Sequence, residues 1–280
     1  MNTRLSRFGP NRLGALCLAV AAVCLSLVGC GKVKSTLQAL LHSSRTSKTR
    51  PVSHASRPAV AGPRLAIILD DVGGDPAAVD AIFSLRYPLT LSVLPNHPRS
   101  MEIAQDAHRR GYQVMLHLPM ESLANETAEI QELRPGMSPG QISNELNSMM
   151  RTVPYAAGVN NHQGSLATSD PHLMSELMPV LREHQLFFVD SRTTAATVAY
   201  EAAQAAGVPC AFRNVPFLDD VQDVSAIRRQ LDLAAKDARE KGQAVAIGHP
   251  HPATLRALAE FLPQAEAQGI HLVHASDLVH

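Results

Sequence analysis

The chain has 280 residues and no net formal charge, because 25 Lys and Arg residues balance 25 Asp and Glu residues. The balance is uneven: residues 1–63 contain nine of the basic residues and none of the acidic ones, so residues 64–280 are acidic overall. An acidic globule with no Trp and 4% aromatic residues lacks the basic surface and stacking side chains that are typical of nucleic-acid-binding domains. The 45% hydrophobic content argues against a fully disordered chain.

Residues 1–29 have the pattern of a secretory signal peptide, in which three arginines precede an uncharged apolar run at 13–29. The run ends in LVGC, which resembles the bacterial lipobox, so Cys30 is expected to be lipidated and to begin the mature protein. Gly31 follows in place of an Asp, which favours an outer-membrane destination. An uncleaved membrane anchor is the alternative. Both interpretations predict an exported, membrane-tethered protein on the periplasmic face.

Residues 30–63 are rich in Ser, Thr, Pro and basic side chains, a composition that cannot bury enough apolar surface to fold. We expect a flexible basic tether. Its charge favours contact with an anionic membrane surface, although a simple soluble spacer fits equally well.

From residue 64 onward, short β-rich runs alternate with longer helical patterns. Several of the runs are continuously apolar, as parallel strands buried on both faces should be. The expected strands are 64–69, 89–94, 113–118, 157–160, 186–189, 210–213, 244–248 and 271–274. The expected helices are 76–85, 98–110, 138–152, 171–184, 194–206, 222–241 and 253–267.

This alternation predicts an α/β fold, namely a single (β/α) barrel of seven to eight strands over residues 64–280. An open, doubly wound sheet is the alternative. A dinucleotide-binding fold is disfavoured, because no GxGxxG motif follows the first expected strand.

Polar side chains follow most of the expected strands, at the end where barrel enzymes carry their chemistry. Imidazole and carboxylate groups are good ligands for Zn²⁺ and other divalent metals. Two adjacent acids that close an apolar strand also repel each other unless a cation or a proton lies between them. The residues in question are Asp70, Asp71, His97, His117, Asn160, Asn161, His162, Asp190, Ser191, Asn214 and His249.

Six segments, ILDDVGG, LPNHP, GYQVMLHLPME, GVNNHQGS, FFVDSRTT and IGHPH, resemble in order the motifs of the divergent polysaccharide deacetylase family. This family is a distant branch of the carbohydrate esterases built on the NodB-like barrel, and the resemblance covers residues 64–280. It implies a NodB-like deacetylase barrel that removes N-acetyl or O-acetyl groups from a polysaccharide in a metal-dependent reaction. The exported location makes peptidoglycan or another envelope glycan the expected partner, whereas the identity of any protein partner cannot be read from the sequence.

The resemblance also implies residue roles. In the parent esterases the first strand ends in two Asp residues, matched here by Asp70 as catalytic base and Asp71 as metal ligand. His117 matches the first metal-binding His, and His249 matches the general acid that protonates the leaving sugar amine. The implied cofactor is a divalent metal, with Zn²⁺ preferred.

Two departures from the parent pattern affect the metal site. Glu121, rather than His, stands four residues after His117, and residues 160–165 replace the parent RxPY segment. We expect His162 to supply the missing imidazole. Glu121 as the third ligand, or no metal at all, are the alternatives.

The remaining polar residues at the strand ends, Asn161, Asp190, Ser191 and Arg192, are expected to hold His249 or to bind sugar hydroxyls. Three other function classes stay open, one of which is a purely structural envelope lipoprotein that would leave the polar strand ends unexplained. Another is a catalytically inactive glycan-binding or regulatory envelope lipoprotein on the same barrel. The third is a glycosidase that uses Asp70 with Asp190, which would leave the histidines at the strand ends unexplained.

Overall fold

The structure is a computed structural model that describes residues 62–124, 129 and 131–280. The predicted signal peptide, the lipidation site at Cys30 and nearly all of the predicted tether lie outside the described residues. The chain divides after Arg57, and every described residue belongs to the compact unit Pro58–His280. None of the helices in the described part of the chain is long and apolar enough to cross a membrane.

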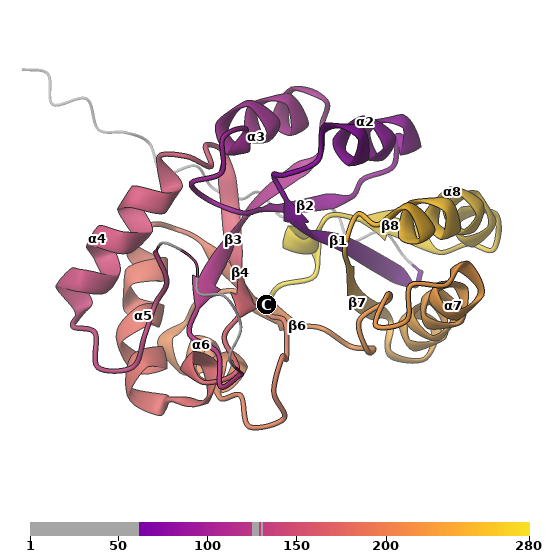
Figure 1. Cartoon of the computed structure of the whole chain (residues 1–280). Coiled ribbons are helices and arrows are strands. Elements are labelled where there is room, and N and C mark those ends of the chain that lie inside the picture. Colours follow the sequence, from indigo (N-terminus) through magenta and orange to yellow (C-terminus); the bar gives the residue numbers. More distant parts are fainter. Residues whose placement is uncertain (1–61, 125–128, 130) are drawn as a thin grey trace, which may run out of the picture. The chain divides into compact units, whose positions relative to one another are not determined.

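Within the described residues, all strands run parallel in one sheet of order β6-β5-β4-β3-β2-β1-β7, with β8 beside β1 (Figure 1). The helices lie outside the ring of strands. The strands are β1 (Arg64–Val72), β2 (Thr90–Val93), β3 (Gln113–Met120), β4 (Ala156–Gln163), β5 (Phe187–Asp190), β6 (Cys210–Phe212), β7 (Gln243–Gly248) and β8 (His271–Val273). The helices are α2 (Pro76–Leu85), α3 (Ser100–Arg109), α4 (Pro139–Met150), α5 (Pro171–Glu183), α6 (Ala199–Ala206), α7 (Val224–Lys241) and α8 (Pro252–Ala267), with short 3₁₀ turns η1 (Ala167–Ser169) and η2 (Ala275–Asp277).

The seam between β6 and β7 is closed by a loop and by the C-terminal segment rather than by a strand ladder. His280 exchanges two backbone hydrogen bonds with Cys210 of β6, and its Nε2 lies 2.8 Å from the side-chain Nε2 of Gln243 in β7. Asn214, just after β6, donates its N–H to the carbonyl of Val245 (2.9 Å) and accepts the Val245 N–H through its Oδ1 (2.7 Å). Farther along, Leu218 donates to the carbonyl of Ile247 (2.9 Å). The result is a nearly closed parallel barrel, which confirms the predicted fold class.

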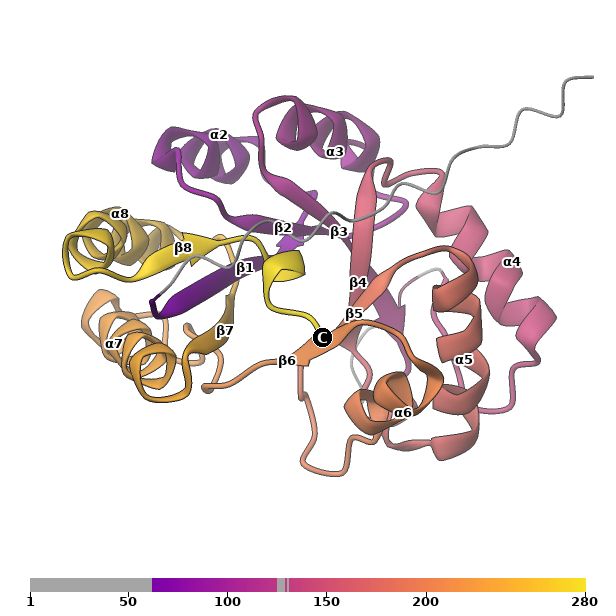
Figure 2. The same cartoon turned by 180° about the vertical axis from the view of Figure 1, so that it is seen from behind.

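Alternation along the strands separates two apolar clusters. In β1, Leu65 packs in the large cluster that includes the helices, whereas Ala66 and Ile68 pack in a smaller cluster on the opposite face. The smaller cluster also contains Ala275 and Leu278 from the C-terminal segment. Figure 2 shows this segment inside the ring of strands, so it fills the barrel interior at the end where the strands begin.

The helix starts follow local chemistry that the sequence indicates. Ser138 caps α4 in a capping box with Gln141, and Asp170 caps α5 by accepting the N–H of Leu173. Helix α6 begins at Ala199 rather than at the expected residue 194. The reason is that Asp190 accepts the hydroxyl of Thr197 (2.9 Å), which holds the intervening segment as a loop.

Three strands run farther than their apolar patterns predict. β1 was expected to end at residue 69, β3 at 118 and β4 at 160, but they continue to Val72, Met120 and Gln163. In β1 and β4 the apolar pattern stops where the strands begin to carry polar side chains, so it underestimates their length, whereas β3 adds Pro119 and Met120. The extensions of β1 and β4 contain Asp70, Asp71 and His162 of the candidate site.

Candidate metal centre

Both carboxylates at the end of β1 reach the same histidine because the strand bulges there. The register with β2 shifts between Leu69 and Val72, and Asp71 adopts a left-handed backbone conformation with φ 56°. In a regular strand, Asp70 and Asp71 would point to opposite faces; a bulge re-aims one of them. As a result, His117 Nε2 lies 3.1 Å from Asp71 Oδ1 and 3.7 Å from Asp70 Oδ2.

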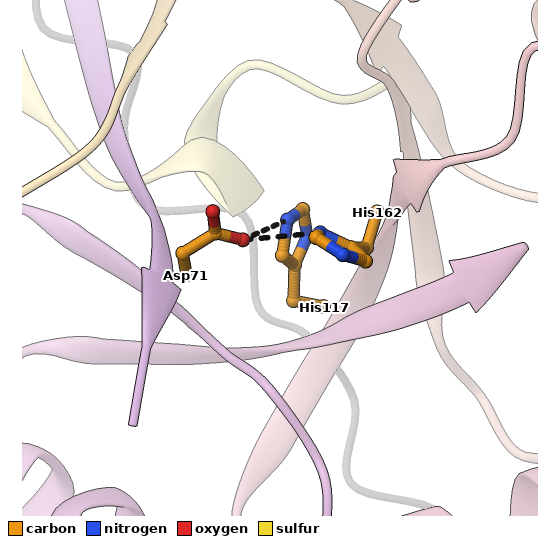
Figure 3. A group of neighbouring side chains, drawn as sticks. All are labelled: Asp71, His117 and His162. Carbon is orange, nitrogen blue, oxygen red and sulfur yellow. Dashed lines mark ion pairs between the residues drawn. The ribbon is translucent and has the colours of Figure 1, made fainter. Parts of the chain in front are cut away.

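Asp71, His117 and His162 form a three-residue group whose ligand atoms converge on one another (Figure 3). Asp71 Oδ1 lies 3.1 Å from His117 Nε2 and 3.0 Å from His162 Nδ1. This oxygen is buried and accepts no hydrogen bond from the described residues. Metal bonds of ~2.0–2.1 Å place ligand atoms about 3 Å apart, so one carboxylate and two imidazoles with these spacings fit a Zn²⁺-type ion.

The electrostatics of this group favour a negatively charged Asp71. Burial opposes its ionisation, but the facing imidazoles of His117 and His162 outweigh that effect and lower the pKa of Asp71. For His117, burial disfavours the charged form, whereas Asp70 and Asp71 outweigh it and raise the pKa of the imidazole. Both shifts have one cause, which is the attraction between the carboxylates of β1 and the imidazoles that face them.

Asn160 connects the first acid of β1 with a histidine of β3. Its Nδ2 donates to both carboxylate oxygens of Asp70 (2.9 and 3.1 Å) and to Ser191 Oγ (3.1 Å). Its Oδ1 accepts from Ser92 and lies 3.1 Å from His117 Nδ1. Because a carboxylate only accepts, this orientation makes His117 donate through Nδ1 and leaves its Nε2 lone pair directed at Asp71.

Asp70 itself is buried, with a side chain only 2% exposed. Burial raises the pKa of its carboxyl, while His117, His249 and the amide of Asn160 act in the opposite direction. A carboxylate with a raised pKa is a better proton acceptor than an ordinary Asp, and this is what a general base requires.

His249, at the end of β7, is held by a carboxylate on the far side of its ring. Asp219 Oδ1 lies 3.0 Å from His249 Nδ1, and Asp219 Oδ2 accepts the His249 backbone N–H (2.7 Å) and the hydroxyl of Thr254 (2.8 Å). The opposite nitrogen, Nε2, lies 3.8 Å from Asp71 Oδ2. Burial opposes protonation of His249, but Asp219 and the acids of β1 outweigh it and raise the pKa to about 9. These contacts favour the protonated form of His249, whose Nε2 lies on the side of Asp71.

Glu129 provides a second carboxylate behind His162. Its Oε1 lies 3.9 Å from His162 Nε2, and its Oε2 lies 3.9 Å from His97 Nε2. Metal-binding histidines commonly direct their other nitrogen at such a group. Glu129 also borders a cavity of about 240 Å³ that His97 lines together with Pro95, Asn96, Pro98, Pro119 and Gln131.

Residues 67–279 match the family model described as divergent polysaccharide deacetylase. The chain belongs to this family.

Relatives within and beyond the family extend the comparison. The uncharacterized protein YibQ of Escherichia coli K12 is 41% identical over 225 residues, which cover 80% of this chain and 70% of YibQ. An uncharacterized protein from Agrobacterium tumefaciens has a similar structure, with TM-score 0.74, 23% identity and coverage of 80% of this chain and 92% of that chain. The catalytic domain of a peptidoglycan N-acetylglucosamine deacetylase from Eubacterium rectale gives TM-score 0.51, 13% identity and coverage of 81% and 96%. At these identities, the two solved structures show the fold alone.

In this member of the family, His162 and not Glu121 belongs to the converging group with Asp71 and His117. The backbone of Glu121 is bonded to neighbouring loops: its N–H donates to Leu133, and its carbonyl accepts from Leu166 and Ala167. The predicted pairing of Asp71, His117 and His162 is therefore brought together by the structure, as are Asp70 and His249 beside it.

The four residues predicted to hold His249 or to bind sugar hydroxyls lie mostly below the surface, and the group that holds the His249 ring is Asp219 instead. Asn161, Asp190 and Ser191 are buried, and their polar groups bond to the β4–β5 region: Asn161 accepts the Ser191 N–H (2.9 Å), and Asp190 accepts the Arg192 N–H (2.8 Å). The guanidinium of Arg192 stacks over the Phe212 ring at 3.5 Å. Substrate binding by these residues stays a prediction; their observed contacts are with the protein itself.

Three residues of the site have no assigned role in the sequence analysis, namely Asn160, Asp219 and Glu129. Asn160 could have been found from the two-residue period of β4, because it shares a face with His162. Asp219 and Glu129 lie several residues beyond the expected strands 210–213 and 113–118, and no local pattern distinguishes them from other loop acids.

Proposed function

We propose that this protein is a metal-dependent hydrolase that removes N-acetyl or O-acetyl groups from an envelope polysaccharide or from peptidoglycan. The observation that carries the proposal is the convergence of Asp71 Oδ1 with one nitrogen each of His117 and His162, beside a buried acid and a charged imidazole. Membership of the divergent polysaccharide deacetylase family supports the same reaction class.

Asp71, His117 and His162 would hold the metal, with Zn²⁺ as the ion that this donor set favours. A divalent ion at this place supplies positive charge that polarises an acetyl carbonyl and lowers the pKa of water. Asn160 keeps His117 in the tautomer that a ligand needs and holds Asp70 in place. Asp70 accepts the proton of the attacking water, a role that its raised pKa favours.

His249 donates a proton to the departing sugar amine or hydroxyl. An amide nitrogen is a poor leaving group without a proton, so this step needs an acid close to the scissile bond. Asp219 serves as the positioning residue, since it fixes the ring through Nδ1 and leaves Nε2 on the side of Asp71. The raised pKa of about 9 keeps His249 protonated at neutral pH.

The choice of an envelope glycan rests on two supports. One is the sequence of residues 1–63, which predicts export, lipidation of Cys30 and a basic tether. The other is the fold shared with a protein described as a peptidoglycan N-acetylglucosamine deacetylase. We infer a lipoprotein that faces the periplasm, with the outer membrane favoured by Gly31. Replacement of Cys30 by Ser should abolish labelling with radioactive palmitate; a labelled Cys30→Ser variant would contradict this inference.

The test of the reaction combines metal content with acetate release from one preparation. The full chain, purified in detergent without added metal, is analysed by elemental mass spectrometry and incubated with purified peptidoglycan and with an N-acetylglucosamine oligosaccharide. We expect about one divalent ion per chain and release of acetate. His117→Ala and His162→Ala should lose both, whereas the control His172→Ala, whose side chain is 72% exposed on α5, should keep both.

Other results would redirect the proposal. Bound metal without acetate from either substrate, together with retained glycan binding after chelation, would identify the glycan-binding or regulatory alternative. New reducing ends in place of acetate would identify a glycosidase. Metal lost in His117→Ala but kept in His162→Ala would contradict His162 as a ligand and favour Glu121.

A further inference from the structure

A second group of metal-binding side chains lies at the junction of β7 and α8. Ligand atoms of Asp219, His249 and His251 lie within 4.8 Å of one another. Both histidines line a cavity of about 190 Å³ that also borders Asp71. The proposed reaction uses His249 and Asp219, but it gives no role to His251.

The local sequence, GHPHP, explains why the two imidazoles lie together. The N–H of His251 donates to the carbonyl of His249 (2.8 Å), which makes a γ-turn around Pro250. The ring centroids of His249 and His251 are consequently 5.7 Å apart, with the rings tilted by 36°. His251 is the N-cap residue of α8, yet its side chain makes no capping hydrogen bond. The imidazole is therefore not used to cap the helix.

The carboxylate of Asp219 is fixed in a way that suits a ligand. Its Oδ2 accepts from the His249 backbone and from Thr254, whereas Oδ1 faces the imidazole of His249 at 3.0 Å. Its side chain is 1% exposed. Gly248 permits the loop that carries Asp219 to approach β7 closely, because a Cβ there would lie only 3.1 Å from the side chain of the preceding Leu218. One oriented carboxylate and two imidazoles are again a donor set for Zn²⁺.

We propose that Asp219, His249 and His251 form a second, weaker divalent-metal site, and that Zn²⁺ bound there inhibits the enzyme. On binding, the proton that His249 Nδ1 shares with Asp219 Oδ1 leaves to solvent, and the freed Nδ1 lone pair becomes a ligand. The imidazole is then a neutral ligand, and a proton left on Nε2 belongs to a far weaker acid than an imidazolium. The reaction loses its proton donor, while the first metal group, formed by Asp71, His117 and His162, stays intact.

The binding part of this proposal is independent of the proposed reaction, and only the inhibition rests on it. The full chain in detergent is dialysed against rising concentrations of Zn²⁺, and bound zinc is counted by elemental mass spectrometry. We expect about two ions per chain at saturation and about one in His251→Ala and in His251→Gln. The dissociation constant of the second ion should rise at least ~10-fold in both variants.

The same samples are assayed for acetate release. Wild-type turnover should fall as the second ion binds. At one equivalent of zinc, His251→Ala should turn over at the wild-type rate. Half-inhibition of this variant should need at least ~10-fold more zinc than half-inhibition of the wild type. His172→Ala is the control for zinc bound by surface histidines, and it should behave as wild type in both measurements. Equal zinc counts in wild type and His251→Ala would overturn the site. Equal inhibition of the two would overturn the regulatory role, and absence of acetate from every sample would count against the proposed reaction alone.

Discussion

Asn160 and Asn161 are adjacent in β4, but their side chains serve opposite faces of the barrel wall. Asn160 points inward and bonds to Asp70, His117, Ser92 and Ser191, so its contacts lie among the groups proposed to act on substrate. Asn161 bonds to the backbone and side chains of the loop after β5 and to its own strand. Two identical side chains, one residue apart, therefore have different partners. Asn160 contacts the groups of the proposed reaction, and Asn161 holds the loop after β5.

The same division recurs at the neighbouring strand ends. Ser191 contacts Asn160 inside the barrel, whereas Asp190 accepts from Arg192 and Thr197 in the loop that leads to α6. In the apolar part of β5, Val189 belongs to the inner cluster and Phe188 to the outer one. The alternation of the apolar part of the strand therefore continues into its polar end. Residues on the inner face contact the candidate site, and residues on the outer face hold the neighbouring loop.

The largest effect is expected at the inward-facing acid of β1. Asp70→Asn preserves the shape of the side chain and removes the proton acceptor, so turnover should fall by ~10²–10⁴-fold. Zinc content should stay at the wild-type level, because Asp71, His117 and His162 are unchanged. Turnover within a few-fold of wild type, measured by acetate release at saturating substrate, would exclude Asp70 as the base.

Asn160→Ala tests the inward member of the asparagine pair. The change removes the acceptor for His117 Nδ1 and the donor to Asp70. Loss of such a supporting partner typically costs ~10–100-fold in metal affinity, and turnover should fall with it. Competition with a zinc chelator measures the affinity, and Asn161→Ala is the matched control that should retain it.

Asp219→Asn tests whether Asp219 is needed to hold and charge His249, the proposed proton donor. The change leaves Asp71, His117 and His162 intact. Turnover should fall by about 10-fold or more, whereas the affinity for the first zinc ion should not change. Because Asp219 raises the pKa of His249, its neutralisation should also move the alkaline limb of the pH–rate profile to lower pH. An unshifted alkaline limb would mean that His249 does not donate the proton.

Asn161→Ala should affect stability rather than chemistry. It leaves the buried N–H of Ser191 without its acceptor, which should lower the free energy of unfolding by about 1–3 kcal/mol. Urea denaturation followed by circular dichroism measures this change. A loss of turnover larger than the loss of folded protein would contradict the division between the two asparagines.

The sequence was sufficient for the barrel and for the residues that end its strands. Apolar runs, Pro and Asp at helix starts, and acids or histidines after the runs follow from local chemistry, so Asp70, Asp71, His117, His162 and His249 could be chosen. The bulge that turns Asp71 beside Asp70 could not be predicted, because a left-handed Asp arises from the register with β2. The partner of His249 was also missed, because the loop that carries Asp219 reaches β7 only in the folded barrel.

The seam between β6 and β7 gives the molecule an unequal resistance to local opening. The first metal group lies on β1, β3 and β4, which belong to one continuous run of paired strands. The proton donor depends on Asp219, which follows the segment that closes the seam through Asn214 and Leu218. Fluctuations that part the seam would detach the acid's support while the ligand strands stay paired. On the proposed mechanism, heating should therefore abolish acetate release at a lower temperature than it releases metal from Asp71, His117 and His162.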